Sequence, residues 1–253
     1  MSEHPIEVSE DAGVRYLHFG SDWVQGAMRI RRPNALELAY TREMMACQLL
    51  RPEASWPRRA LLIGLGAASL TKHFFHYLPH CHFTVVEINP SVVAAARQFF
   101  KLPAEAEGRF EIVVGDGAAY VEQAEEKFDA ILVDGFDPDA RAGALDTLAF
   151  YRHCRDRLNE QGLFVTNLLG RSRGFAASVK RIADAFEQRT LVFPSGDSGN
   201  TIAFAACGEA VEVSTAELKE RAEALKKESG LNLLPTLARI SEAGQLSGGK
   251  LAL

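Results

Sequence analysis

The sequence has few cysteines, and none of them lies near another. The four are Cys47, Cys81, Cys154 and Cys207, and this spacing argues against a metal knuckle or a redox pair. Because disulfides form mainly in oxidising compartments, we expect reduced core thiols in a cytoplasmic protein. No apolar run approaches the roughly 20 residues that a membrane span needs. The acidic first residues also lack the apolar core of an export signal, so we expect neither membrane insertion nor export.

The sequence also lacks an excess of positive charge. Its 28 lysines and arginines are outnumbered by 33 acidic residues, which gives a formal net charge of −5. This balance argues against a nucleic-acid binder. A chain of 253 residues with 47% hydrophobic residues is long and apolar enough for one large globular domain with small additions.

Four apolar runs organise the middle of the chain. They span residues 60–66, 82–87, 110–117 and 128–134, and each ends in a glycine or an acid. Short, nearly continuous apolar runs that alternate with helical patterns indicate parallel strands buried on both faces. The alternation continues to residue 187, and two further strands at 189–193 and 201–206 are joined by a turn-rich link. We therefore predict an α/β fold with an open, doubly wound, mostly parallel sheet and an antiparallel C-terminal hairpin.

The sequence divides into three parts. Weak alternation and turn signals predict a small N-terminal β-hairpin region over residues 1–32. The sheet and its helices fill a catalytic domain over residues 33–208, beginning with a helix at about 34–50. Residues 209–253 form a C-terminal helical extension and tail, with helices predicted from 214 and over about 232–243.

Glycines and acids follow the first three core strands. Gly64-Leu-Gly66 lies between a strand and a helix, where it allows a ligand to approach the backbone and the free N–H groups of the helix. Glu87 ends the next strand, where an acid can bind ribose hydroxyls. Asp116 follows the third strand and can accept a hydrogen bond from an adenine amino group. Alternatively, Glu87 and Asp116 only cap the helices that follow them.

Two acids follow the fourth strand. Asp134 and Asp137 stand three residues apart on one loop, which suits a cationic partner or the removal of a proton from an amine. A solvated loop with a helix cap is the alternative.

Two clusters of basic residues have simpler interpretations. His73, His76, His80 and His82 are close in sequence, but Pro79 divides them and no acid completes the set, so we expect no metal site. A run of arginines at 29, 31 and 32 is typical of a solvated strand end, and contact with a phosphate is the alternative.

Taken together, these motifs resemble those of a known family. They are Val24-Gln25, Leu38-Ala-Tyr40, Leu62-Ile-Gly-Leu-Gly66, Val86-Glu-Ile-Asn-Pro90, Gly115-Asp-Gly117, Val133-Asp-Gly-Phe-Asp-Pro138 and Phe193-Pro-Ser-Gly196. Over most of residues 14–207 the chain resembles the spermidine synthase-like aminopropyltransferases, within the AdoMet-dependent methyltransferase superfamily. The resemblance implies a Rossmann-like class I methyltransferase sheet, a homodimer, and a small-molecule amine as acceptor.

The resemblance also implies roles for individual residues. Decarboxylated AdoMet, or AdoMet itself, is the implied co-substrate, with Glu87 at its ribose, Asp116 at its adenine and Gln25 beside its thioether end. Tyr40 and Asp137 correspond to residues of the amine pocket, and Asp134 to the catalytic base. The full implied cofactor-binding set is Gln25, Gly64, Gly66, Glu87, Asp116 and Gly117.

Three positions depart from the family pattern. Ala67 stands where the family has an aspartate that holds the free amine of the decarboxylated cofactor. Its loss removes an attraction for that amine and a repulsion against a carboxylate, so ordinary AdoMet becomes more acceptable. Phe193 replaces a tyrosine, and residues 167–169 are more apolar than the polar segment usually found there.

Three functions are compatible with the sequence. The first is aminopropyl transfer to an amine in polyamine metabolism, with release of methylthioadenosine. The second is AdoMet-dependent methylation of a small molecule, which Ala67 favours. The third is non-catalytic nucleoside binding by a protein that has kept the adenosyl site.

Overall fold

A seven-stranded sheet forms the centre of the protein, with the strand order β6-β5-β4-β7-β8-β10-β9. The computed structural model describes residues 5–20, 23–51, 53–106, 108–136, 142–196, 199–244, 246 and 248–253. The sheet strands are β4 (Arg59–Ile63), β5 (His82–Glu87), β6 (Phe110–Val114), β7 (Phe128–Val133), β8 (Leu158–Leu169), β9 (Thr190–Pro194) and β10 (Asn200–Ala206). The first four pair in parallel and β7 also pairs in parallel with β8, whereas β10 runs antiparallel to both β8 and β9. The predicted fold class and the C-terminal hairpin are confirmed.

The strands that follow β4 in the sequence lie on both sides of it in the sheet. β5 and β6 lie on one side of it, and β7 and β8 lie on the other. In open α/β sheets such a switch of direction opens a crevice at the carboxyl ends of the strands. Any ligand of the sheet is therefore expected at the ends of β4, β5, β6 and β7.

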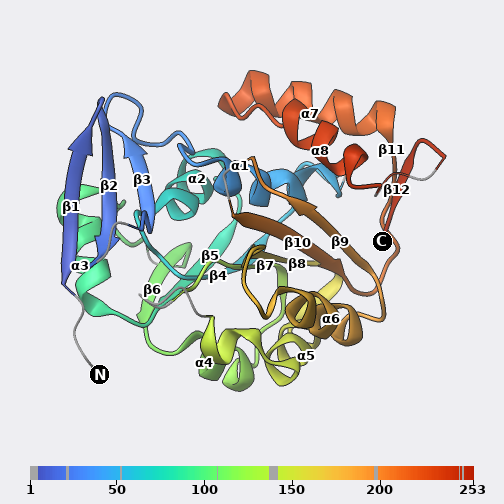
Figure 1. Ribbon diagram of the computed structural model, residues 1–253, viewed down its shortest axis with the longest axis horizontal. Helices are drawn as coiled ribbons and strands as arrows, with labels where there is room; N and C mark the ends of the chain where they lie inside the picture. Colours follow the sequence, from blue (N-terminus) through green and yellow to red (C-terminus); the bar gives the residue numbers. More distant parts are fainter. Residues whose placement is uncertain are drawn as a thin grey trace.

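Helices cover both faces of the sheet (Figure 1). One layer consists of α1 (Ala39–Met44), the 3₁₀ helix η1 (Met45–Leu49), α2 (Ser69–Tyr77) and α3 (Pro90–Phe99). The other layer consists of α4 (Gly117–Gln123), α5 (Leu148–Asp156) and α6 (Phe175–Ala185), with the short 3₁₀ helix η2 (Gly143–Asp146) before α5.

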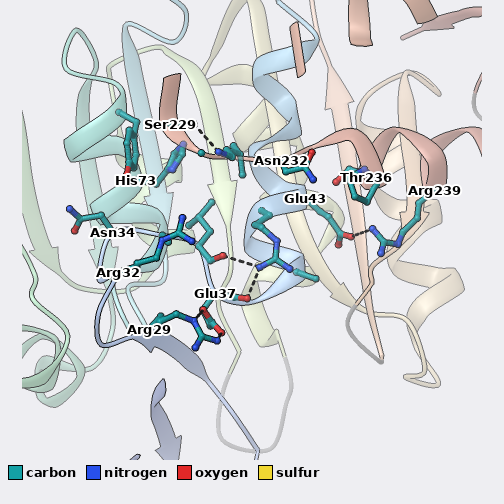
Figure 2. A pocket seen from close by; sticks show the side chains of 18 residues that line it. Arg29, Arg32, Asn34, Glu37, Glu43, His73, Ser229, Asn232, Thr236 and Arg239 are labelled. Carbon is teal, nitrogen blue, oxygen red and sulfur yellow. Dashed lines mark hydrogen bonds and ion pairs between the residues drawn. The ribbon is translucent and has the colours of Figure 1, made fainter. Parts of the chain in front are cut away.

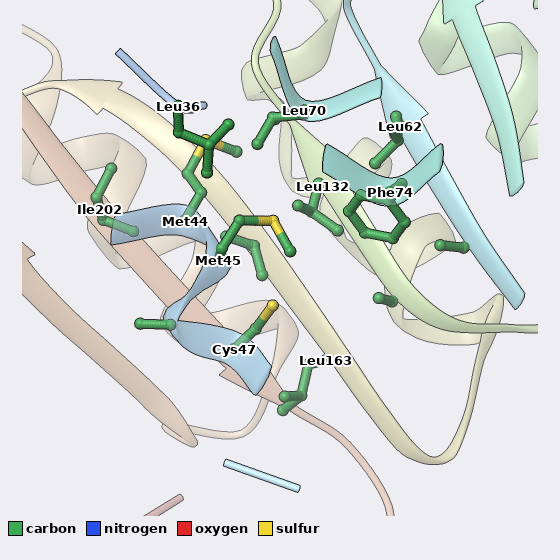
Figure 3. Packing of buried hydrophobic residues seen from close by; sticks show 14 of the residues in the cluster. Leu36, Met44, Met45, Cys47, Leu62, Leu70, Phe74, Leu132, Leu163 and Ile202 are labelled. Atoms are coloured by element: carbon green, nitrogen blue, oxygen red, sulfur yellow. The ribbon is translucent and has the colours of Figure 1, made fainter. Parts of the chain in front are cut away.

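Alternate residues of each strand enter two separate cores, one on either face. In β4, Leu62 packs into the first core and Leu61 into the second. Figure 3 shows the first core, in which Met44 and Met45 lie over the sheet near Leu163 and Ile202. This alternation is the physical reason for the nearly continuous apolar runs, because a strand covered on both faces exposes neither.

A small antiparallel sheet precedes the central one. Its strands are β1 (Ile6–Asp11), β2 (Val14–Phe19) and β3 (Gly26–Arg29), paired in that order. The prediction of two or three short antiparallel strands in this region is thereby confirmed. Figure 1 shows this sheet at one end of the molecule, beside α2 and α3.

The first predicted helix starts later than the sequence suggested. Residues 30–38 form turns, and α1 begins only at Ala39 rather than at about 34. The Arg42 guanidinium donates hydrogen bonds to the carbonyl oxygens of Leu36 and Glu37. These bonds satisfy backbone acceptors outside a helix, which local periodicity does not reveal.

The C-terminal segment contains a feature that the sequence pattern did not show. Helices α7 (Thr215–Ser229) and α8 (Leu234–Glu242) lie along the top of the view in Figure 1, near α1. The flanking strands β11 (Glu212–Ser214) and β12 (Lys250–Ala252) pair antiparallel. The expected tail therefore returns to form a two-stranded sheet. Ser214 begins α7 with a capping box, in which its side chain and that of Glu217 exchange bonds with the backbone.

Candidate active site

The glycine loop after β4 allows two strand ends to touch. Gly64 has a φ of +95°, and a Cβ atom on it would lie 2.2 Å from the carbonyl oxygen of Asp134. No other residue type fits this position without moving the end of β7. The backbone N–H of Asp134 donates to the carbonyl of Ile63 at 2.9 Å. The loop and the first acid of the β7 end are therefore in direct contact.

Glu87 is buried at the end of β5 and is fixed by backbone amides. The N–H of Leu65 in the glycine loop donates to its Oε2 at 2.9 Å, and the N–H of Asn89 donates to its Oε1 at 2.9 Å. Burial raises the pKa of the carboxyl, and these amide hydrogen bonds oppose the rise. The helix that follows is capped by Asn89, which accepts from the N–H of Ser91. Glu87 is therefore not the cap of α3, although that was one interpretation of the sequence.

Asp116 does cap the helix that follows it. Its Oδ1 accepts from the N–H groups of Ala118 at 2.8 Å and Ala119 at 2.9 Å. The residue is exposed, and its second carboxylate oxygen has no partner among the described residues. Capping and ligand binding are therefore compatible at this position. Gly117 lets α4 approach β4, since a Cβ atom there would lie 2.4 Å from Cγ2 of Ile63.

Two exposed apolar side chains flank these acids, and the sequence analysis did not select them. Ile88 follows Glu87 and is 61% exposed, and Val114 precedes the Asp116 turn and is 54% exposed. Large apolar side chains exposed beside polar groups are typical of a ligand surface. Their sequence signal was an apolar residue beyond the last buried position of a strand.

Asp134 lies at the end of β7 beside two hydrogen-bond donors. Nδ2 of Asn167, from the neighbouring β8, lies 3.1 Å from its Oδ1. The Tyr40 side chain on α1 also bonds to it. Burial raises the pKa of the Asp134 carboxyl, and the bonds from Asn167 and Tyr40 oppose that rise. A carboxylate with a raised pKa is a stronger base than one in water.

Asn167 was not among the predicted site residues. It is 5% exposed, and its Oδ1 is buried without a hydrogen-bond partner in the part of the chain that the structure describes. On the strands beside it, Ile202 faces Asn167 and Phe193 faces Ile202. This row leads from the candidate base towards Phe193, the position at which the resembled family has a tyrosine. An amide within an apolar strand was the available sequence signal, because a buried polar group needs a partner.

The N-terminal sheet places Gln25 over the glycine loop. A Cβ atom on Gly66 would lie 3.2 Å from the carbonyl oxygen of Gln25, and one on Gly26 would lie 2.6 Å from Cβ of Ala67. Ala67 is 2% exposed. The alanine and the glycine therefore fit against each other, which leaves little space for a larger side chain at either position.

A small cavity collects most of the predicted residues. It is lined by Gln25, Tyr40, Gly64, Gly66, Ala67 and Asp134, together with Thr41 and Leu70 among others. Glu87, Asp116 and Gly117 do not line it and lie at the ends of β5 and β6 instead. Asp137 lies outside the described residues. The site thus has two adjoining parts, one at β4 and β7 and the other at β5 and β6.

Glu43 is a buried acid that the sequence analysis missed. It is 1% exposed on α1, and its Oε1 accepts from the N–H of Gly196 at 3.0 Å and from Arg239 at 2.8 Å. Its Oε2 accepts from the Ser195 hydroxyl. Glu43 therefore joins α1, the β9–β10 link and α8. Because these partners are about 150 and 200 residues away in sequence, no local pattern reveals them.

Among the described residues, no group of three or more His, Cys, Asp or Glu side chains comes together as a metal site would require. In the same part of the chain, no helix is both long and apolar enough to cross a membrane.

Comparisons with known proteins show which family the chain is similar to. The family model of the spermine/spermidine synthase domain matches residues 37–171. A polyamine aminopropyltransferase of Neisseria meningitidis is 37% identical over 96% of this chain and 91% of its own length.

Solved structures show the same fold. A probable spermidine synthase from Corynebacterium glutamicum has a TM-score of 0.71 at 22% identity, over 88% of this chain and 84% of that one. A spermidine synthase in complex with the transition-state analogue AdoDATO has a TM-score of 0.63 at 23% identity, over 95% and 89% of the two chains.

Proposed function

The chain belongs to the spermine/spermidine synthase family, and we propose that it is an aminopropyltransferase of polyamine metabolism. It moves an aminopropyl group from decarboxylated AdoMet to an amine acceptor and releases methylthioadenosine. The match to a polyamine aminopropyltransferase over 96% of the chain favours this transferase activity over methylation and over non-catalytic nucleoside binding.

One structural observation carries the proposal for the site. Gln25, Tyr40 and Asp134 come from three distant parts of the chain, and all three line the small cavity at the glycine loop. A thioether group, an amine and a base would have to meet at one point in this reaction. The convergence therefore supports Asp134 as catalytic base, Tyr40 as an amine-pocket residue and Gln25 as a cofactor residue.

Asp134 has the chemistry that the acceptor requires. An alkylamine with a pKa of roughly 10 is mostly protonated at neutral pH and is then not a nucleophile. An acidic cavity attracts the cation, and Asp134 takes a proton from it. As the nitrogen forms a bond to the aminopropyl carbon, the carbon–sulfur bond breaks. Its electron pair returns to the sulfonium sulfur, which leaves as a neutral thioether. Catalysis then consists mainly of alignment and proton removal.

The residues at β5 and β6 suit the adenosyl part of the co-substrate. Glu87 would face the ribose and the second carboxylate oxygen of Asp116 the adenine amino group, with Ile88 and Val114 as apolar neighbours of the ring. Gly64, Gly66 and Gly117 have no side chain, so the backbone at these positions can come close to the co-substrate. Ala67 leaves open which form of AdoMet binds better, because no charge at that position attracts the amine or repels a carboxylate.

Product analysis tests the activity. The protein is incubated with decarboxylated AdoMet, or with AdoMet, and a panel of diamines and polyamines. We expect methylthioadenosine and a longer polyamine. S-adenosylhomocysteine with a methylated amine would show methylation instead. Binding of methylthioadenosine without any product would favour a nucleoside-binding protein.

The organisation of the protein is part of the proposal. We infer an N-terminal β-region over 1–32, a catalytic domain over 33–208 and a C-terminal extension over 209–253, on the basis of the separate sheets in each part. The expected homodimer stays a prediction from the family resemblance, and the expected cytoplasmic localisation stays a prediction from the sequence. Light scattering coupled to size-exclusion chromatography tests the dimer.

A further inference from the structure

A second, larger cavity lies on the other side of α1 from the candidate active site. Its volume is about 430 Å³, and it is enclosed by residues 29–37, α1, α2 and the C-terminal helices (Figure 2). Tyr40 and Thr41 face the active-site cavity, whereas Ala39, Arg42 and Glu43 line this one. One helix therefore separates two cavities, and the larger is not part of the proposed aminopropyl-transfer site.

The larger cavity has an excess of positive charge. Four arginines line it, at positions 29, 32, 42 and 239, together with two acids, Glu37 and Glu43. Arg29 pairs with Glu37, and Arg239 pairs with Glu43, with Nη1 2.8 Å from Oε1 (Figure 2). These two pairs are neutral, so the charges of Arg32 and Arg42 are uncompensated in a protein whose net charge is −5.

Arg42 is held in place without being neutralised. Its Nη1 donates to the carbonyl oxygens of Leu36, at 2.9 Å, and Glu37. Neither carbonyl carries a formal charge, and the other two nitrogens of the guanidinium have no partner among the described residues. A fixed guanidinium with unused donors is prepared to bind an anion.

The side chain of Arg32 has neither an ion pair nor a hydrogen bond within the described part of the chain. The sequence analysis grouped it with Arg29 and Arg31 as a solvated strand end, and the structure separates the three. Arg29 pairs with Glu37, and Arg31 and Arg32 are both exposed, but Arg32 lines the cavity and Arg31 does not. Only one residue of the run is therefore both unpaired and directed to this cavity.

The rest of the wall carries no further charged side chain and includes both polar and apolar residues. Its polar residues include Asn34, Asn232 and Thr236, and the His73 ring, which packs at a tilt against Tyr77 with 5.0 Å between ring centroids. Burial lowers the pKa of His73 to about 4, so the imidazole is neutral at pH 7. Amide, hydroxyl and imidazole groups can bind the uncharged polar part of a ligand.

We propose that this cavity binds a small anion with a phosphate or carboxylate group, held by Arg32 and Arg42. Guanidinium groups match the planar donor geometry that both oxyanions accept. The volume of about 430 Å³ lies within the range of roughly 300–1,000 Å³ that small-molecule sites occupy. The uncharged polar residues of the wall, together with its apolar ones, favour a ligand larger than a bare ion, such as a phosphorylated sugar.

Calorimetry with matched variants tests the proposal. Inorganic phosphate, ribose 5-phosphate and succinate are titrated into the protein at constant ionic strength. We expect saturable binding of at least one of them. The compound with the lowest Kd identifies the preferred anionic group and shows whether the uncharged part of the wall contributes to binding. Arg32→Met should weaken that binding about tenfold or more, since it removes a charge-assisted contact to the anion. Arg31→Met, a neighbouring exposed arginine outside the cavity, should leave it unchanged.

Two results would overturn the proposal. One is the absence of saturable binding for all three anions. The other is equal binding by wild type and Arg32→Met, which would place the anion elsewhere, for example at the adenosyl site. Because the side chain of Arg32 makes no hydrogen bond or ion pair with a described residue, its replacement should leave the unfolding temperature unchanged, and this is measured alongside.

Discussion

The side-chain amide of Asn167 donates a hydrogen bond to the carboxylate of Asp134, with Nδ2 and Oδ1 3.1 Å apart. An ionised carboxylate only accepts, so the amide must present its NH₂ group to Asp134 and its oxygen elsewhere. That oxygen is buried without a partner among the described residues. Asn167 is therefore in a position to orient the base.

Asn167→Leu should shift the pH dependence of catalysis. Loss of a donor to the carboxylate, worth roughly 1.5–3 kcal/mol, raises the pKa of Asp134 by about one to two pH units. We expect the acidic limb of the pH profile of kcat/KM to move to higher pH by that amount. Asn167→Asp should move it further in the same direction, because a like charge also disfavours ionisation. An unshifted limb in both variants would show that Asn167 does not act through Asp134.

Asp134→Asn should abolish proton removal while preserving the shape of the site. We expect turnover to fall about 10²–10⁴-fold, with little change in the Kd of methylthioadenosine. Glu87→Gln provides the contrast. It should weaken methylthioadenosine binding about tenfold and lower kcat much less, since Glu87 is proposed to bind ribose rather than to take part in the reaction. Near-normal turnover in Asp134→Asn would exclude its role as base.

Ala67→Asp should change the preference between the two forms of AdoMet. The added carboxylate would attract the amine that AdoMet and decarboxylated AdoMet share, and it would repel the carboxylate that only AdoMet has. A like-charge contact costs about 1–4 kcal/mol near a protein surface. We expect the affinity for AdoMet to fall at least about tenfold relative to that for the decarboxylated form, measured by calorimetry. Ala67→Asn is the matched control. It has the same bulk against Gly26 without the charge, so an equal change in both variants would assign the effect to packing alone.

Lys72 makes the stability of the protein dependent on pH. Its side chain is buried on α2, its Nζ donates to the carbonyl of Phe100 at 2.8 Å, and burial lowers its pKa from 10.5 to about 7. Between these values the unfolded chain binds the proton and the folded chain does not, so this residue's contribution to stability rises from pH 7 to pH 10.5.

Lys72→Met should remove that dependence. Between pH 7 and pH 9.5, the free energy of unfolding of the wild type should increase by roughly 2–3 kcal/mol relative to the variant. Urea denaturation at both pH values measures this difference, in which the titration of the buried cysteines cancels. Lys180→Met, at an exposed lysine paired with Asp184, is the control and should show no such change. A constant difference between wild type and Lys72→Met would show that Lys72 keeps an ordinary pKa.

The sequence by itself determined the sheet and the acids at its edge. Buried parallel strands leave a strong local signal, and Gly64, Glu87, Asp116 and Asp134 stand next to that signal in the chain. Their common location follows from topology, because the carboxyl ends of parallel strands meet at one edge. The family resemblance added Gln25 and Tyr40, which no strand pattern could place.

Only the tertiary structure decided which side chains act on those acids and which cavities form. Four features join segments that are distant in sequence. They are the bond from Asn167 to Asp134, the contact between Ala67 and Gly26, the Glu43–Arg239 pair and the larger cavity lined by Arg32. Each depends on how helices and small sheets pack on the central one. Local periodicity records whether a residue is buried, but the identity of its partner is set by packing between elements.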